Sequence, residues 1–147
     1  MHRRNIFRAA LAATGGLFAA RAVAQDAGVR RPSASKVAYH LSDADKVVFV
    51  LGNIQNHIDG GPKDVEIVLV VHGPALKSFH AKSADADLSR RVAGFSRAGV
   101  GLAACGHTMK SQKVGLTDLL PGFTVAEQGG VVRLAELQSM GYVYLRP

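Results

Sequence analysis

From residue 36 onward the chain alternates between short apolar runs and stretches with apolar residues at steps of three and four. The run 65–71 (VEIVLVV) is almost continuously apolar, which is typical of a strand buried on both faces of a sheet. The helical spacing over residues 44–58 predicts an amphipathic helix that ends at Gly60, and the segment beginning at Ser42 is typical of a helix-capping sequence.

The same reading applied to the rest of the chain predicts five strands with helices between them. Strands are expected at 36–41, 65–71, 100–105, 123–127 and 142–145, and helices at about 42–60, 75–80, 88–98, 108–113 and 130–140. Strands that alternate with helices are typical of parallel βαβ units. The sequence therefore predicts an α/β fold, a three-layer α/β/α sandwich around an open, mostly parallel five-stranded sheet.

The first 24 residues form a segment of their own. They contain four arginines and no acidic residue, a weakly apolar run at 9–20, and an Ala-x-Ala sequence at 22–24. This order is typical of a secretory signal peptide, and the pair Arg3 and Arg4 favours the twin-arginine type. The apolar run is shorter than the roughly 20 residues of a membrane span, so no stable membrane insertion is expected. We expect export to the periplasm, with an amphipathic helix of the mature fold as the alternative reading.

Composition adds limits on the function of the remaining chain. Residues 25–35 are small and polar and read as a flexible lead-in, which leaves one domain at 36–147. Of 18 basic residues four lie in the leader, so the rest carries only about +3 and nothing favours nucleic acid as a partner. The GxGxxG and Walker sequences are absent, and no tightly bound cofactor is expected.

Four polar residues fall at the ends of predicted strands, where open α/β sheets bind ligands: His40, His72, Cys105 and Glu127. Whether they meet depends on the order of the strands, which the sequence leaves open. Two of the histidines with Cys105 or Glu127 could bind a metal ion, but no close ligand spacing supports this, and no metal is expected.

Cys105 is the strongest candidate for chemistry. It is the only cysteine and precedes a predicted helix, where backbone N–H groups and the helix dipole favour a thiolate. His107 could add positive charge beside it, and His72 could orient or polarise the thiol. The alternative is an inert thiol that acts as a small buried apolar group. His57 and His80 fall near helix ends and are expected at the surface.

Several segments of the chain resemble the DsrE/DsrF-like proteins, in particular a small branch that ends in LQ-x-x-GY-x-Y. They are HLSDADKVVFVLGNIQNHID, VHGPALK, GVGLAACGHTMKS, LLPGFTV and LQSMGYVYLRP, in order over residues 36–147. The resemblance implies an open five-stranded α/β/α sandwich that assembles as a homo-oligomer, often a trimer or hexamer. In the sulfur-relay members a strand-end cysteine carries sulfane sulfur as a persulfide, and Cys105 matches that position. Those members continue with an Arg-Arg-Gly segment, where this chain has KSQKVG at 110–115.

The first hypothesis is therefore an exported DsrE-like protein that handles sulfane sulfur through a persulfide at Cys105. His107 and His72 would assist the thiol, no cofactor would be needed, and sulfur donor or acceptor proteins would be the partners. The alternatives are a non-catalytic, oligomeric module that binds a small ligand, and a thiol or metal sensor.

Overall fold

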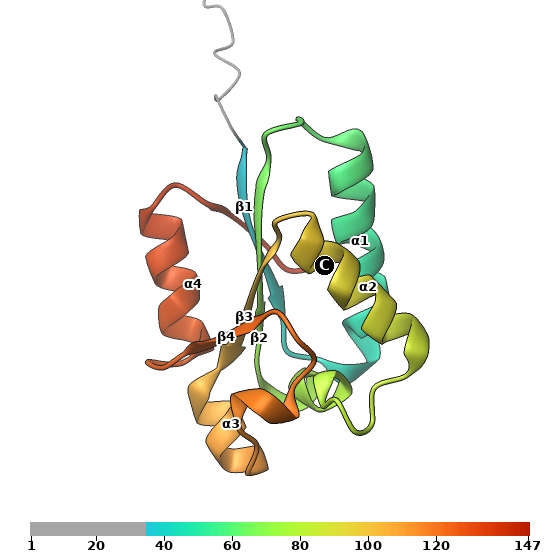
Figure 1. Ribbon diagram of the computed structural model, residues 1–147. Coiled ribbons are helices and arrows are strands. Elements are labelled where there is room, and N and C mark those ends of the chain that lie inside the picture. Colours follow the sequence, from blue (N-terminus) through green and yellow to red (C-terminus); the bar gives the residue numbers. More distant parts are fainter. Residues whose placement is uncertain (1–34) are drawn as a thin grey trace, which may run out of the picture. The chain divides into compact units, whose positions relative to one another are not determined.

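Five parallel strands form the centre of the structure (Figure 1). The computed structural model describes residues 35–147, so the predicted leader at 1–24 and nearly all of the lead-in at 25–35 lie outside the described residues. The strands are β1 (Lys36–Leu41), β2 (Glu66–Val71), β3 (Gly101–Cys105), β4 (Phe123–Ala126) and β5 (Val143–Leu145). Their order is β4-β3-β2-β1-β5 and every pair is parallel, which confirms the expected open parallel sheet.

Helices cover both faces and one end of this sheet. The α-helices are α1 (Val47–Gly60), α2 (Ala86–Arg97), α3 (Gly106–Gln112) and α4 (Gly130–Ser139). Three short 3₁₀ helices accompany them: η1 (Ala44–Lys46), η2 (Gly73–Phe79) and η3 (Leu116–Asp118). Figure 1 shows α1 and α2 on one side of the sheet, α4 on the other, and α3 beyond the strand ends. None of the described helices is long and apolar enough to cross a membrane.

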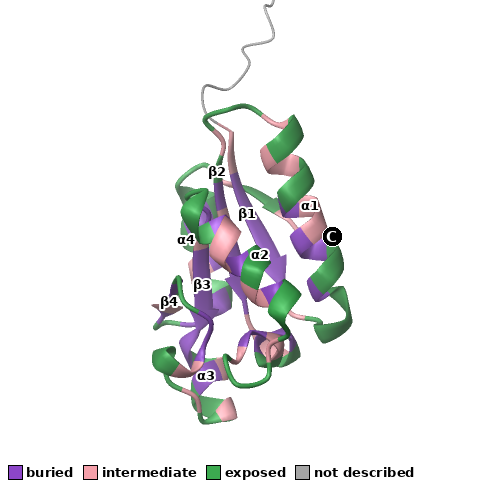
Figure 2. Cartoon of the chain, turned by 45° about the vertical axis from the view of Figure 1, so that its right-hand side comes forward, coloured by how far each residue is buried: buried purple, intermediate pink, exposed green. Residues whose placement is uncertain are grey.

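The two faces of the sheet bury unequal cores. The larger core lies under α1 and α2, and Figure 2 shows the strands buried with the outer sides of the helices exposed. The smaller core, under α4, consists of Ala38, Val70, Ala103, Leu134 and Leu137. Because side chains alternate along a strand, residues two positions beyond these on β1, β2 and β3 also point to the α4 side. These residues are His40, His72 and Cys105.

Local structure departs from expectation at two helix starts. Helix α3 begins at Gly106, directly after β3, rather than at Thr108. Glycine permits this immediate turn, because a Cβ at position 106 would lie only 3.1 Å from the carbonyl oxygen of Ala126. The expected helix at 75–80 is instead the 3₁₀ helix η2, which starts at Gly73 (φ +59°) with proline in its first turn.

The capping sequence at Ser42 was also a wrong expectation. Asp43 precedes η1 without a capping hydrogen bond, and it pairs instead with Arg146 at 3.2 Å. Asp85 does cap a helix, because its carboxylate accepts the N–H of Leu88 at the start of α2. The start of α1 is therefore stabilised by packing of the helix and not by a side-chain cap.

Candidate functional site

The strand order brings the strand-end residues into one row. Strands β4, β3, β2 and β1 are successive neighbours, so the strand ends near Glu127, Cys105, His72 and His40 lie at the same edge of the sheet. Val71 pairs with Ala104, which places His72 and Cys105 at the next level of adjacent strands. The topology therefore brings His40, His72 and Cys105 near one another, whereas Glu127 does not join them.

Hydrogen-bond donors surround the sulfur of Cys105. Cys105 is the residue before α3, and its sulfur accepts the backbone N–H groups of His107 and Thr108. It also accepts the N–H of Gly130, the first residue of α4, and the hydroxyl of Thr108. Donors from two separate helix starts therefore meet at one sulfur atom, an arrangement that favours negative charge on it.

The Thr108 hydroxyl is oriented for this role by a second contact. The N–H of Gly73 donates to Thr108 Oγ1 at 3.0 Å. Because that bond uses an acceptor lone pair of the hydroxyl, its proton stays free to point at the sulfur. Gly73 at the start of η2 thus supports the cysteine through Thr108.

These donors decide the ionisation of Cys105. Burial raises the pKa of the thiol, but the hydrogen bonds from Thr108, Gly130 and His107 outweigh burial and bring the pKa below its usual value. Cys105 is only 6% exposed. The site therefore favours the thiolate form of Cys105, and only a small reagent can reach the sulfur without movement of the protein.

Gly130 lies next to both Cys105 and His72. A Cβ added to Gly130 would lie 3.3 Å from the Cβ atoms of both residues, so those two atoms are no more than twice that distance apart. Glycine is needed here because a side chain would enter the space between the thiol and the imidazole.

His72 continues into a chain of hydrogen-bonded rings. His40 Nε2 faces His72 Nε2 within hydrogen-bond distance, and His40 Nδ1 lies 2.6 Å from the hydroxyl of Tyr144 on β5. The two imidazole planes differ by 16° with centroids 4.7 Å apart. Since the Nε2 atoms point at each other, the rings meet edge to edge in a common plane rather than face to face.

The pair of histidines is neutral at pH 7. Burial, together with the nearby His72 and Arg146, lowers the pKa of His40 to about 4. Burial and the charge of Arg146 also lower the pKa of His72. A single shared proton between two Nε2 atoms fits this state, because two imidazolium rings would place donors against each other.

The other predicted residues lie outside this cluster. The imidazole of His107 is exposed and lies against Gly129, so its contact with the sulfur is made by the backbone N–H. Glu127 is exposed and has no hydrogen bond or ion pair within residues 35–147. Among the same residues no three His, Cys, Asp or Glu side chains gather as metal ligands.

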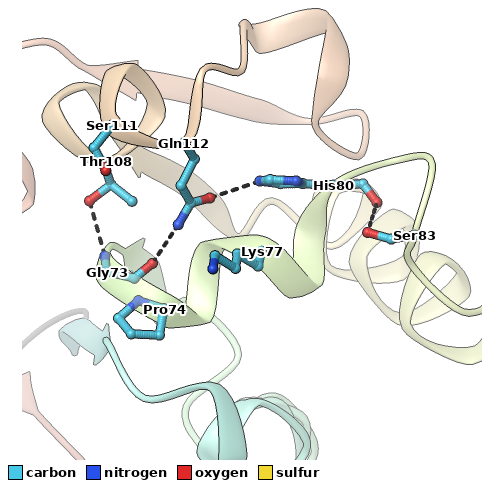
Figure 3. A pocket seen from close by; sticks show the side chains of 8 residues that line it. All are labelled: Gly73, Pro74, Lys77, His80, Ser83, Thr108, Ser111 and Gln112. Atoms are coloured by element: carbon cyan, nitrogen blue, oxygen red, sulfur yellow. Dashed lines mark hydrogen bonds between the residues drawn. The ribbon is translucent and has the colours of Figure 1, made fainter.

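A hollow of about 700 Å³ lies on the other side of Thr108 (Figure 3). Gln112 donates to the carbonyl of Gly73 at 3.0 Å, which turns its own carbonyl toward His80 Nε2 at 2.8 Å. His80 must therefore carry its proton on Nε2. His80 and His57 are both half-buried, and His57 Nδ1 lies 3.0 Å from the hydroxyl of Tyr39, so neither is the surface residue expected.

Three contributors to the site were missed by the sequence analysis: Thr108, Gly130 and Tyr144. Thr108 lies within the ACGHTM segment, and Tyr144 lies within LQSMGYVYLRP. Both belong to the most distinctive stretches of the chain, which is the one signal that could have singled them out. Gly130 carries no such signal, since one glycine among 16 says nothing of its neighbours.

Solved structures share this fold. No family model and no curated protein matches the sequence. A protein of unknown function from Methanobacterium thermoautotrophicum, MTH1491, is 25% identical with a TM-score of 0.68, over 77% of this chain and 99% of its own. BT1422 from Bacteroides thetaiotaomicron, also of unknown function, is 20% identical with a TM-score of 0.58, over 77% and 95%.

The ychN protein of E. coli is similar in fold at 11% identity, with a TM-score of 0.63 over 78% of this chain and all of its own. At this identity the similarity concerns the fold and not the activity. Residues 35–147 therefore share the fold of the ychN protein, an all-parallel five-stranded sheet between layers of helices.

Proposed function

We propose that this protein is an exported carrier of sulfane sulfur that holds the sulfur as a persulfide on Cys105. The observation that carries the proposal is the position of Cys105 between the starts of α3 and α4, where donors from His107, Thr108 and Gly130 lower the pKa of its thiol. A thiolate, not a thiol, is the nucleophile in sulfur chemistry. The DsrE/DsrF-like fold supports a sulfur-relay type of protein and agrees with this chemistry.

Loading of the sulfur needs no cofactor or external oxidant. The Cys105 thiolate attacks a terminal sulfur of an inorganic polysulfide and forms a new S–S bond. The adjacent S–S bond of the polysulfide breaks, and the shortened polysulfide leaves with the electron pair. A small linear donor suits the site, because the cysteine is only 6% exposed.

The proposal predicts a mass gain of one sulfur atom on the full chain after incubation with polysulfide, measured by intact mass spectrometry. Cys105→Ser should show no gain, because the chain has a single cysteine. Reduction with a small thiol should remove the added sulfur from the wild type. No adduct with any donor, together with a Cys105 that resists alkylation, would instead favour the ligand-binding module, for which the hollow beside Thr108 is the available space.

The proposal of export rests on the sequence of the leader. Arg3 and Arg4 precede a short apolar run, as in twin-arginine signals. Replacing both with lysine should therefore keep the full chain in the cytoplasm, because that route reads the arginine pair rather than positive charge alone. Cell fractionation and immunoblotting measure this, with Arg30→Lys and Arg31→Lys as the matched control. Equal export of both double variants would contradict the twin-arginine assignment.

A further inference from the structure

We infer that Tyr144, His40 and His72 form a proton path that carries the proton of an incoming thiol away from the Cys105 site to solvent. The inference rests on the proposed persulfide chemistry and deepens it, since it names a protonated small thiol as the sulfur acceptor. It assigns His72 as the proton acceptor and His40 and Tyr144 as positioning residues.

The three side chains form an unbroken line of hydrogen bonds across the sheet. They come from the ends of neighbouring strands in the order β2, β1, β5, and each successive pair is within hydrogen-bond distance. His40, in the middle, is 9% exposed, whereas Tyr144 at the edge strand is 38% exposed. The line thus runs from the half-buried His72, next to Cys105, to the exposed edge of the sheet.

The His72 end of the line has one ring nitrogen without a hydrogen bond. His72 Nε2 bonds to His40, and His72 Nδ1 has no hydrogen-bond partner within residues 35–147. No buried side-chain nitrogen or oxygen of the described residues lacks a partner, so this unpaired Nδ1 is accessible rather than buried. Since the His72 and Cys105 Cβ atoms flank Gly130, the imidazole and the thiol start from neighbouring positions, and Nδ1 is the atom that we assign to receive the proton.

The line supports two proton arrangements. In one, His72 Nε2–H donates to His40 Nε2 and His40 Nδ1–H donates to the Tyr144 oxygen, which leaves a lone pair on His72 Nδ1. In the other, the Tyr144 hydroxyl donates to His40, His40 Nε2–H donates to His72, and His72 Nδ1 carries a proton. Shifting the protons along the line converts one into the other, so a proton taken up at His72 can be released at Tyr144.

The reaction that uses this path balances without another reagent. The S–H bond of the acceptor thiol breaks as His72 takes the proton, and the acceptor sulfur attacks the outer sulfur of the Cys105 persulfide. A new S–S bond forms, the old S–S bond breaks, and its electron pair stays on Cys105 as a thiolate. The hydrogen bonds around Cys105 make that thiolate a good leaving group.

Nearby charges favour a path that passes the proton on rather than stores it. Arg146 lies close enough to lower the pKa of both histidines, and Asp43, which pairs with Arg146, opposes it more weakly. With a pKa of about 4, His40 releases a proton to Tyr144 and solvent at any pH near neutrality.

The experiment separates loading from transfer. The full chain is loaded with polysulfide and desalted, and sulfur loss is followed by intact mass at pH 7 after adding one of two small thiols. One thiol is almost fully protonated at this pH, and the other is acidic enough to be largely ionised. Tyr144→Phe and His72→Gln should slow transfer to the protonated thiol by about a hundredfold, the lower end of general-base contributions, and transfer to the ionised thiol by less than about twofold.

Tyr142→Phe is the matched control, since its hydroxyl bonds to Glu66 and lies outside the line. It should leave both rates unchanged. Equal slowing with both thiols would show a merely structural role and overturn the inference, as would no slowing with either. Failure of the wild type to load would instead reject the persulfide proposal.

The path has a test that needs no sulfur donor. Nitrogen-15 NMR of the histidine rings should show one protonated and one unprotonated Nε2 in the pair at pH 7, and Tyr144→Phe should shift the His72 resonances as well as those of His40. Independent titration of the two rings near the ordinary pKa of histidine, about 6.5, would overturn the inference.

Discussion

Replacing Thr108 with valine should raise the pKa of the Cys105 thiol and slow its alkylation at pH 7 by about tenfold. Valine matches threonine in shape but cannot donate to the sulfur, and the loss of one hydrogen bond to a charged group corresponds to roughly one pKa unit. The hydroxyl is the largest of the hydrogen-bond contributions that lower this pKa. The N–H of Gly73 also loses its acceptor, which should reduce the free energy of unfolding.

The measurement is the alkylation rate with a small reagent as a function of pH. The rates of wild type and Thr108→Val should converge at high pH, because both thiols are then ionised, and diverge as the pH falls. Thr108→Ser keeps a hydroxyl and should resemble the wild type. Thr117→Val removes an exposed hydroxyl elsewhere and should change nothing. Overlapping profiles for wild type and a folded Thr108→Val would show that the hydroxyl does not stabilise the thiolate.

The fold was largely predictable because buried, apolar positions recur periodically along the sequence. A strand between two helical layers is apolar along most of its length, so its bounds can be read from the sequence. Strand β1 has the predicted bounds, and β2 differs from the prediction by one residue. The starts of α3 and η2 were less predictable. They depend on how closely Gly106 approaches Ala126 and on the backbone of Gly73, which are properties of packing and not of local propensity.

The site was predictable only in part, for a similar reason. Cys105 could be singled out because its signals are local: a strand before it and a helix after it. His40 and Tyr144 are 104 residues apart, and nothing local says that β5 returns to lie beside β1. The role of His107 was assigned to its side chain, whereas the structure uses its N–H, which every residue but proline would supply.

The use of the His107 backbone, and not its side chain, determines which mutations should affect the site. A site built from backbone N–H groups resists side-chain replacement at positions such as His107, but it is sensitive to backbone geometry. The geometry is set where α4 begins, because Gly130 must direct its N–H at the Cys105 sulfur while leaving room for His72. The residue before it, Gly129, has φ +101° and ψ 157°, a conformation that only glycine adopts readily.

Gly129→Ala should therefore lower the free energy of unfolding by about 1–3 kcal/mol and also raise the pKa of Cys105. The added Cβ would lie 2.9 Å from Cδ2 of His107, but that exposed ring can rotate away, so the main cost is backbone strain. Relief of the strain would turn the N–H of Gly130 away from the sulfur and remove one of its donors. Denaturant unfolding and the pH profile of alkylation measure the two effects.

Gly141→Ala separates strain from its effect on the site. Gly141 also has a positive φ, +88°, but a Cβ there meets no atom within 4 Å, and the residue follows the far end of α4. It should destabilise the protein through strain alone and leave the alkylation profile of Cys105 unchanged. An unchanged profile in Gly129→Ala as well would mean that the start of α4 does not control the thiol. A shifted profile in that variant only would tie the chemistry of Cys105 to one glycine conformation.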